Sequence, residues 1–209
     1  MNIVVLAGGL STERDVSLNT GTMVSKALRS KGHNVIMLDV FMGYHEEEED
    51  ITDIFNHTEE ASADVAQIPG EAPDIAQVKA MRKDQSACFF GPNVIKICQA
   101  ADIVFMALHG ENGENGKIQA AFDLFGIQYT GSRYLGSALA MDKGISKKMF
   151  EAAGIPTPHG IAMSKTQRHT PFSETGLTLP CVVKPCCGGS SIGVTIVRTA
   201  DEYEAALDE

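Results

Sequence analysis

Long apolar stretches and a basic leader are both missing from this chain of 209 residues. Its longest apolar runs, such as residues 103–108, are far shorter than the roughly 20 residues of a membrane-spanning helix. The opening Met1-Asn2-Ile3 lacks the positive charges that begin a secretory signal. We therefore expect a cytoplasmic protein with no membrane partner.

The residues that build zinc sites and nucleic-acid sites are missing as well. The five cysteines include no C-x-x-C pair and the six histidines are scattered, so no zinc-ligand spacing is present. No basic patch interleaved with aromatic residues occurs, which argues against a nucleic-acid partner. In a cytoplasmic protein we expect all five cysteines to be reduced thiols.

One segment lacks basic residues altogether. Residues 39–74 hold twelve acidic side chains and no lysine or arginine, so the net charge of −10 belongs to this segment. We interpret its most acidic run, residues 46–50, as a solvated loop or a frayed helix end. A docking surface is the alternative interpretation of the same run.

The spacing of apolar residues in the first two thirds of the chain predicts alternating strands and helices. Strands are predicted at residues 3–7, 34–40, 102–108 and 127–130, and helices at 16–31, 93–100, 116–125 and 135–153, the last with a break near Asp142. The apolar stripe of the first helix runs through Thr20, Met23, Val24, Ala27 and Leu28. This alternation is typical of an α/β fold with a Rossmann-like parallel sheet.

The last third of the chain has a different character, with prolines between short segments. Strands are predicted at residues 179–184 and 193–197, joined by a Gly-rich loop. A final helix at 201–209 is closed by no glycine or cap, so we expect the chain to be the N-terminal part of a longer protein. We therefore predict a first domain at 1–140, with an acidic insertion at about 46–90, and a truncated second domain at 141–209.

Two loops follow buried strands at the carboxyl edge of the predicted sheet, where open α/β sheets bind ligands. The first, residues 8–17, carries the carboxylate of Glu13 and has Ser17 as a predicted helix cap. The second, residues 109–116, has three glycines and begins with His109, which could donate to an anion. Each loop alone is also compatible with capping or structural roles, and only the pair favours an active site.

The Gly-rich loop at 185–193 follows Lys184, whose charge suits phosphate. Glycines allow the backbone to approach an anion closely. The loop is not a P-loop, because G-x-x-x-x-G-K-[ST] is absent and a strand, not a helix, follows. We interpret it as a flap that closes over phosphates, with an ordinary Gly-Ser hairpin as the alternative.

These segments together resemble one family. The resemblance rests on Gly8-Gly9 with Glu13 and residues 17–21, on the run 109–120, on Met141-Asp142-Lys143, and on Lys184-Pro185 with residues 189–193. In this order they are similar to the D-alanine–D-alanine ligases of the ATP-grasp superfamily, and only the acidic insertion is left uncovered. The run His-Gly-x-x-Gly-Glu-Asn-Gly-x-Ile-Gln-Ala is its specific part.

For ATP, the resemblance implies that Lys143 and Lys184 bind the phosphates. It also implies that the flap closes over them through Gly188, Ser191 and Ile192. The family uses Mg²⁺ or Mn²⁺ with ATP, and the resemblance places the acidic and Asn metal ligands beyond residue 209. The catalytic Arg and a Tyr are expected there too, so we expect no metal ligand and no turnover within this chain alone.

For the amino acids, the resemblance implies that Glu13 holds the amino group of the first D-alanine and orients Ser190 through a hydrogen-bond chain. His109 would lie beside that substrate's carboxylate. Ser190, with the loop around Gly189 and Ser191, would position the second amino acid. The γ-phosphoryl group of ATP would pass to the first carboxylate, and the second amine would attack this acyl phosphate to give the dipeptide for peptidoglycan.

Several alternatives stay open. The second substrate could instead be D-lactate or D-serine, because the discriminating residues are expected outside the chain. A non-catalytic module that binds a nucleotide or amino acid is a rival of another class. A homodimer is also left open by the sequence.

Overall fold

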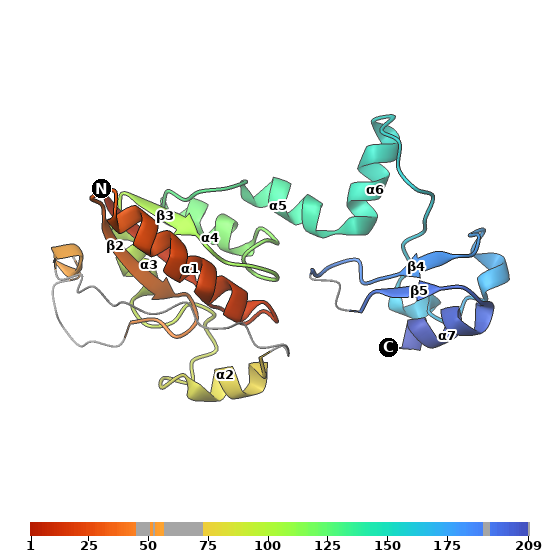
Figure 1. The fold of residues 1–209 in the computed structure, drawn as a ribbon, viewed down its shortest axis with the longest axis horizontal. Helices are drawn as coiled ribbons and strands as arrows, with labels where there is room; N and C mark the ends of the chain where they lie inside the picture. Colours follow the sequence, from red (N-terminus) through yellow and green to blue (C-terminus); the bar gives the residue numbers. More distant parts are fainter. Residues whose placement is uncertain (45–50, 52, 57–72, 190–192, 209) are drawn as a thin grey trace. The chain divides into compact units, whose positions relative to one another are not determined.

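The computed structural model describes residues 1–44, 51, 53–56, 73–189 and 193–208 (Figure 1). The chain divides into two compact units, Met1–Ala138 and Leu139–Glu209. Its helices and strands, in chain order, are β1 (Asn2–Ala7), α1 (Arg14–Arg29), β2 (Asn34–Asp39), the 3-10 turn Ile54–Asn56, α2 (Ile75–Met81), α3 (Val94–Ala100), β3 (Ile103–Met106), α4 (Lys117–Phe125), α5 (Tyr134–Met141), α6 (Lys143–Ala152), the 3-10 turns Lys165–Gln167 and Phe172–Glu174, β4 (Cys181–Val183), β5 (Thr195–Val197) and α7 (Ala200–Asp208).

The first unit is built on a parallel sheet with the strand order β2-β1-β3. Side chains of β1 alternate between two apolar clusters: Ile3, Val5 and Ala7 pack with residues of α1, whereas Val4 and Leu6 pack with residues of α3 and α4. A strand covered on both faces reads as a continuous apolar run, which is what the sequence of β1 shows. The predicted α/β fold with a parallel sheet is confirmed.

Helix α1 faces the sheet with only part of the predicted apolar stripe: Val24 and Leu28 pack against the cluster of Ile3, Val5 and Ala7, and the rest of the contact is made by small residues. Its buried face includes Ser17, Gly21 and Ser25, while Met23 from the predicted stripe is 59% exposed. The helix lies so close to β1 that a Cβ atom at Gly21 would come within 2.8 Å of the Cβ of Ala7. Close approach requires small residues at the contact, and hydrophobic spacing alone does not reveal this requirement.

Two further elements differ from the sequence-based expectation. The predicted strand at 127–130 is reduced to a single parallel bridge between Val104 and Tyr129. Helix α2 was not predicted; Asp74 caps it by accepting hydrogen bonds from the backbone of Ala76 and Gln77. The acidic run 46–50 and the end of the flap, 190–192, lie outside the described residues.

The second unit contains the predicted pair of strands, β4 and β5, which are antiparallel with Val182 opposite Ile196. Helix α7 packs on one face of this pair, where Tyr203 is buried and its ring centroid lies 5.3 Å from that of Phe172. On the other face Val182 and Ile196 are 53% and 56% exposed. No helix in the described parts of the chain is long and apolar enough to cross a membrane.

Candidate functional site

The loops after β1 and β3 are tied together by a buried serine of α1. The backbone N–H of Gly8 donates to Ser17 Oγ over 2.9 Å, and Ser17 Oγ donates to the carbonyl of Ala107 over 2.8 Å. The predicted role of Ser17 as a helix cap is therefore wrong. The N-cap position belongs to Glu13, and Ser17 lies one turn later on the face against the sheet.

Glu13 is held between two loops. Its backbone N–H donates to Ser11 Oγ over 3.1 Å, and Ser11 Oγ in turn donates to the carbonyl of His109 over 2.7 Å. A Cβ atom at Gly110 would lie 2.7 Å from Glu13 Oε2, so the carboxylate lies directly against the backbone of the second loop. The structure thus brings together the two loops that the sequence placed at one sheet edge.

His109 has a polar neighbour beside each ring nitrogen. Its Nε2 lies 3.0 Å from the hydroxyl oxygen of Thr20 on α1. Its Nδ1 lies 3.8 Å from a carboxylate oxygen of Glu114, in the same loop. A hydrogen-bond partner restricts the orientation of an imidazole ring, and Thr20 is that partner for His109, whereas Glu114 lies beyond hydrogen-bond distance.

This edge of the sheet can bind both ends of an amino acid. The carboxylate of Glu13 suits an ammonium group, and charge-assisted hydrogen bonds of this kind are among the stronger polar contacts in proteins. The imidazole of His109 can donate to a carboxylate. The loop 109–116 also leads into the N-terminus of α4, where backbone N–H groups favour anions.

In the second unit, Lys143 contacts the flap. Lys143 is the first residue of α6, and its Nζ donates to the carbonyl oxygens of Gly188 over 2.7 Å and Cys186 over 3.4 Å. Its backbone N–H also donates to the carbonyl of Cys186 over 2.9 Å. The predicted break between the two helices is confirmed at Asp142, whose side chain caps α6 by accepting from Ile145 N.

The other predicted ATP-binding residues contribute less to the described structure. Lys184 follows β4 and is exposed, as is Gly189. Ser190, Ser191 and Ile192 lie outside the described residues. The lysine-to-flap contact is therefore the part of the predicted phosphate site that the structure brings together.

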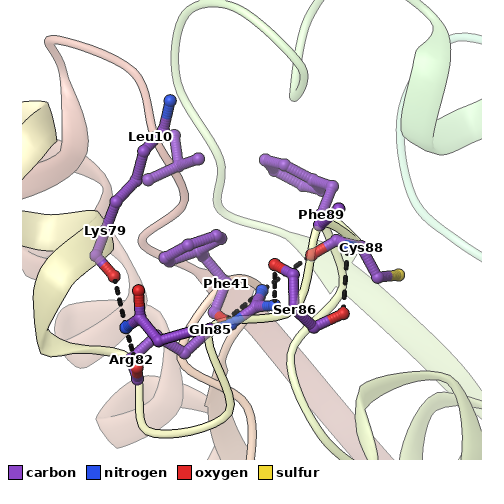
Figure 2. Close-up of a pocket in the computed structure, with 9 residues that line it drawn as sticks. Leu10, Phe41, Lys79, Arg82, Gln85, Ser86, Cys88 and Phe89 are labelled. Carbon is purple, nitrogen blue, oxygen red and sulfur yellow. Dashed lines mark hydrogen bonds between the residues drawn. The ribbon is translucent and has the colours of Figure 1, made fainter.

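A cavity of about 370 Å³ lies beside the first loop (Figure 2). The guanidinium group of Arg82 closes one wall: it donates to the carbonyls of Cys88 (2.7 Å) and Ser86 (2.5 Å), pairs with Asp84, and lies 4.5 Å from the centroid of the Phe41 ring. Figure 2 shows Arg82 beside Phe41, with dashed hydrogen bonds that join residues of the segment around it. Because its guanidinium is used by the protein itself, Arg82 is a structural wall rather than a ligand-binding group.

Sequence reasoning missed the side chains that hold the two loops. Ser11 and Thr20 act through contacts with His109, which is far from both in the sequence, whereas Glu114 lies beside His109 in the same loop. Their position in the sequence could have indicated this role, because each lies within or just after a loop that follows a buried strand. Thr20 was instead assigned to the apolar stripe of α1.

Among the described residues, no three His, Cys, Asp or Glu side chains lie together in a way that could hold a metal ion. The five cysteines, all of which are described, are free thiols. Cys186 is half-buried and Cys187 is exposed.

Family models cover most of the chain. Residues 2–132 match the model of the D-ala D-ala ligase N-terminus, and residues 149–209 match that of the D-ala D-ala ligase C-terminus. Both models describe one class of protein, the ATP-grasp ligases of D-amino acids, as the fold and the paired loops suggested. The chain belongs to the D-alanine–D-alanine ligase family.

Curated relatives agree with this assignment. A D-alanine–D-alanine ligase of Lacticaseibacillus casei is 42% identical over 212 aligned residues, covering 100% of this chain and 57% of the relative. One from Pediococcus pentosaceus is 44% identical over 210 residues, covering 100% of this chain and 59% of the relative. The chain thus spans little more than half the length of the relatives that it matches.

Solved structures show the same relationship. The D-alanine–D-alanine ligase of Bacillus anthracis aligns with a TM-score of 0.66 at 28% identity, covering 100% of this chain and 53% of that structure. The D-Ala:D-Ser ligase VanG of Enterococcus faecalis aligns with a TM-score of 0.65 at 30% identity, covering 100% and 58%.

Proposed function

We propose that this chain is part of an ATP-dependent ligase that joins two D-alanines to D-alanyl-D-alanine for peptidoglycan synthesis. The observation that carries the proposal is the convergence of the Glu13 loop and the His109 loop at one sheet edge, in a chain of this family. In the proposed reaction, the first D-alanine is phosphorylated on its carboxylate by ATP. The amine of the second then attacks the acyl phosphate, and inorganic phosphate leaves.

In this proposal the first unit binds the first D-alanine. Glu13 takes the ammonium group, and His109 lies on the carboxylate side. Support comes from contacts that are in place before any substrate arrives: Ser11 Oγ accepts from the backbone N–H of Glu13, and the Thr20 hydroxyl lies within hydrogen-bond distance of His109 Nε2. A binding group that is already oriented loses little entropy when the substrate binds.

The second unit, in the same proposal, handles the phosphates and covers them. Lys143 and Lys184 neutralise phosphate charge, since phosphoryl transfer depends mainly on positioning and electrostatic stabilisation. The flap, with Gly188, Gly189 and residues 190–192, excludes water from the acyl phosphate. Support comes from the contact of Lys143 Nζ with the flap backbone, which couples the cation to the loop. Ser190 is proposed to be oriented by Glu13 and to position the second amino acid.

The remaining parts of the proposal are coarser. Mg²⁺ or Mn²⁺ would supply charge neutralisation on the phosphates, but the described residues offer no cluster to ligate it, so no metal ligand is assigned to this chain. The cytoplasm is the proposed location, which fits five free cysteines. The proposed domains are residues 1–140 and 141–209, and a homodimer is a proposed assembly.

A second candidate function is ligation of D-alanine to D-serine. The similarity to VanG, a D-Ala:D-Ser ligase, favours it, because the sequence identity is comparable to that with the D-alanine–D-alanine ligase structure. Both reactions use the same first substrate. Comparing D-alanine with D-serine as the second substrate separates the two candidates.

The experiment measures ADP release from Mg-ATP, with and without D-alanine, by the whole protein as its organism makes it. Release should depend on D-alanine and fall at least about 100-fold in Glu13→Ala, because a misplaced or unpaired substrate loses orientation. The matched control is Glu111→Ala, which removes an exposed carboxylate from the other loop and should retain the wild-type rate. ADP release that is independent of D-alanine would mean that D-alanine is not the substrate. Absence of ADP release would contradict the proposed ligase activity.

A further inference from the structure

Two neighbouring cysteines lie in the described part of the flap. Cys186 is half-buried, Cys187 is exposed, and both are free thiols. A Cβ atom added at Gly144 would lie 3.7 Å from Cys186 Sγ, so this thiol lies against the first turn of α6. Cysteines that respond to oxidants are accessible to solvent and lie next to a second, resolving cysteine. The pair has both properties, and the proposed function assigns it no role.

The carbonyl group between the two cysteines is the one that Lys143 contacts. The carbonyl oxygen of Cys186 accepts from the backbone N–H of Lys143 over 2.9 Å and from Lys143 Nζ over 3.4 Å. Lys143 is the first residue of α6, where a backbone N–H has no partner within its own helix. The peptide unit that links the two thiols therefore also satisfies a hydrogen-bond donor at the start of α6.

A disulfide between the neighbouring cysteines would disturb this peptide unit. Disulfides normally join Cα atoms roughly 4.4 to 6.8 Å apart. Neighbouring Cα atoms are about 3.8 Å apart across a trans peptide bond. Closing the S–S bond would therefore twist the peptide between Cys186 and Cys187 and turn the Cys186 carbonyl away from Lys143. A disulfide strained in this way is easily reduced, which is typical of bonds that form transiently in a reducing compartment.

We propose that Cys186 and Cys187 form a reversible oxidation site, at which a disulfide between them breaks the contact of Lys143 with the Cys186 carbonyl. The inference goes beyond the proposed function, because neither the S–S bond nor its effect on Lys143 requires ligase activity. If the proposed function also holds, oxidation acts on the phosphate side and leaves the loops of Glu13 and His109 unchanged.

The oxidant in this proposal is hydrogen peroxide. The exposed thiolate of Cys187 attacks one peroxide oxygen, so that an S–O bond forms, the O–O bond breaks and water leaves. The thiolate of Cys186 then attacks the sulfur of this sulfenic acid, which forms the S–S bond and releases a second water. The two thiols lose two hydrogens and two electrons in total, and the peroxide is reduced to two waters. The second step is intramolecular, which favours it over attack by a thiol from solution.

The test treats this chain with hydrogen peroxide and measures its intact mass. Wild type should lose the mass of two hydrogens, and dithiothreitol should restore the original mass. Cys186→Ser and Cys187→Ser should show no such loss. The matched controls are Cys88→Ser, which removes an exposed thiol from the first unit, and Cys181→Ser, which removes a half-buried thiol from β4. Both should lose two hydrogens as wild type does.

A second readout follows the Lys143 amide by NMR in the reduced and the oxidised wild-type chain, so it needs no variant. In the oxidised chain its resonance should move and its hydrogen exchange should become roughly tenfold faster, because a hydrogen bond is lost. The control is the amide of Ser17, which donates to the carbonyl of Glu13 over 2.9 Å in the first turn of α1. Its exchange rate should be the same in both chains.

Two results would overturn the oxidation site itself. One is a gain of oxygen without the loss of two hydrogens, and the other is a loss that persists in Cys187→Ser or disappears in Cys181→Ser. An oxidised chain whose Lys143 amide behaves as in the reduced chain would overturn the effect on the flap contact. None of these measurements uses ADP release, so failure of the proposed function is detected separately.

Discussion

The two units hold their proposed binding groups in very different ways. In the first unit Glu13 and His109 rest on a sheet whose central residues Val4 and Val5 are fully buried, and side-chain hydrogen bonds cross between loops. In the second unit the sheet has the two strands β4 and β5, and the hydrogen bonds from Lys143 to the described part of the flap go to backbone carbonyls. The proposed amine-binding side is therefore held by side-chain bonds between loops, and the proposed phosphate side by bonds from one lysine to the backbone.

This difference suits the two tasks. A small amino acid offers few contacts, so the groups that recognise it must be in place beforehand. A flap that closes over ATP must move to admit substrate and release product, and moving elements come from the less stable parts of a protein. Substitutions in the first unit should therefore affect global stability, whereas those in the flap should have local effects.

The largest effect is expected from Gly8→Ala. Gly8 has φ of +76°, and an added Cβ would meet the Asp39 carboxylate at 2.4 to 2.7 Å, so this carboxylate must leave its bonds with Arg14, Phe41 and Met42. We expect a loss of about 3 kcal/mol or more in the free energy of unfolding, measured by urea denaturation. The control in the second unit is Gly154→Ala, where φ is +70° but no atom lies within 4 Å. It should cost about 1 kcal/mol, and equal losses would contradict the contrast between the units.

The next largest effect is expected from Ser17→Ala. This change leaves the N–H of Gly8 and the carbonyl of Ala107 without their buried hydrogen-bond partner. We expect the free energy of unfolding to fall by about 2 kcal/mol. Ser25→Ala is the matched control on the same face of α1, because Ser25 Oγ is buried and finds no hydrogen-bond partner among the described residues. Removing that hydroxyl should change stability by less than about 0.5 kcal/mol. A Ser25→Ala loss as large as that of Ser17→Ala would count against the bridge.

A third test uses pH. Burial raises the pKa of the Cys98 thiol, in the core of the first unit, from 9.0 to about 12. The unfolded chain therefore releases this proton at lower pH than the folded one, so stability is lost as pH rises from 9.0 towards 12. Relative to Cys98→Ala, wild type should lose about 1.4 kcal/mol by pH 10. Cys187→Ser, at an exposed site, should leave the pH profile unchanged, and an identical profile in Cys98→Ala would refute the account.

The smallest effect on stability is expected from Lys143→Met. Its contacts with Gly188 and Cys186 are partly exposed, so the free energy of unfolding should change by less than about 1 kcal/mol. Amide hydrogen exchange at residues 186–189 should nevertheless speed up. Lys148→Met, an exposed lysine on the same helix, should leave that exchange as in wild type. Faster amide exchange throughout the first unit would show that the effect of the substitution is not confined to the flap.

The sequence predicted what depends on local patterns. Apolar runs located β1, β2 and β3, and the rule that ligands bind at the carboxyl edge placed the loops of Glu13 and His109 side by side. It could not predict what depends on distance between elements. The face that α1 turns to the sheet follows from its close approach to β1. The role of Ser17 follows from the amide of Gly8 and the carbonyl of Ala107, which come together only in the folded sheet.

The pairing of charged residues was also beyond prediction from the sequence. Arg14 and Asp39 are separated by 24 residues, and nothing in either local pattern indicates that they form a buried pair. The acidic composition of residues 39–74 led to an interpretation as solvated chain, yet Asp39 at its start is largely buried. Pairing across strand ends is a tertiary property.

The most direct test of the account maps where D-alanine binds. Backbone amide shifts of this chain should be recorded during titration with D-alanine, with L-alanine as the control. We predict that D-alanine shifts the amides of residues 9–13 and 109–116, that L-alanine does not, and that Glu13→Gln abolishes the response. Shifts confined to the second unit, or equal shifts with both enantiomers, would contradict the assignment of the prepared edge to the first substrate.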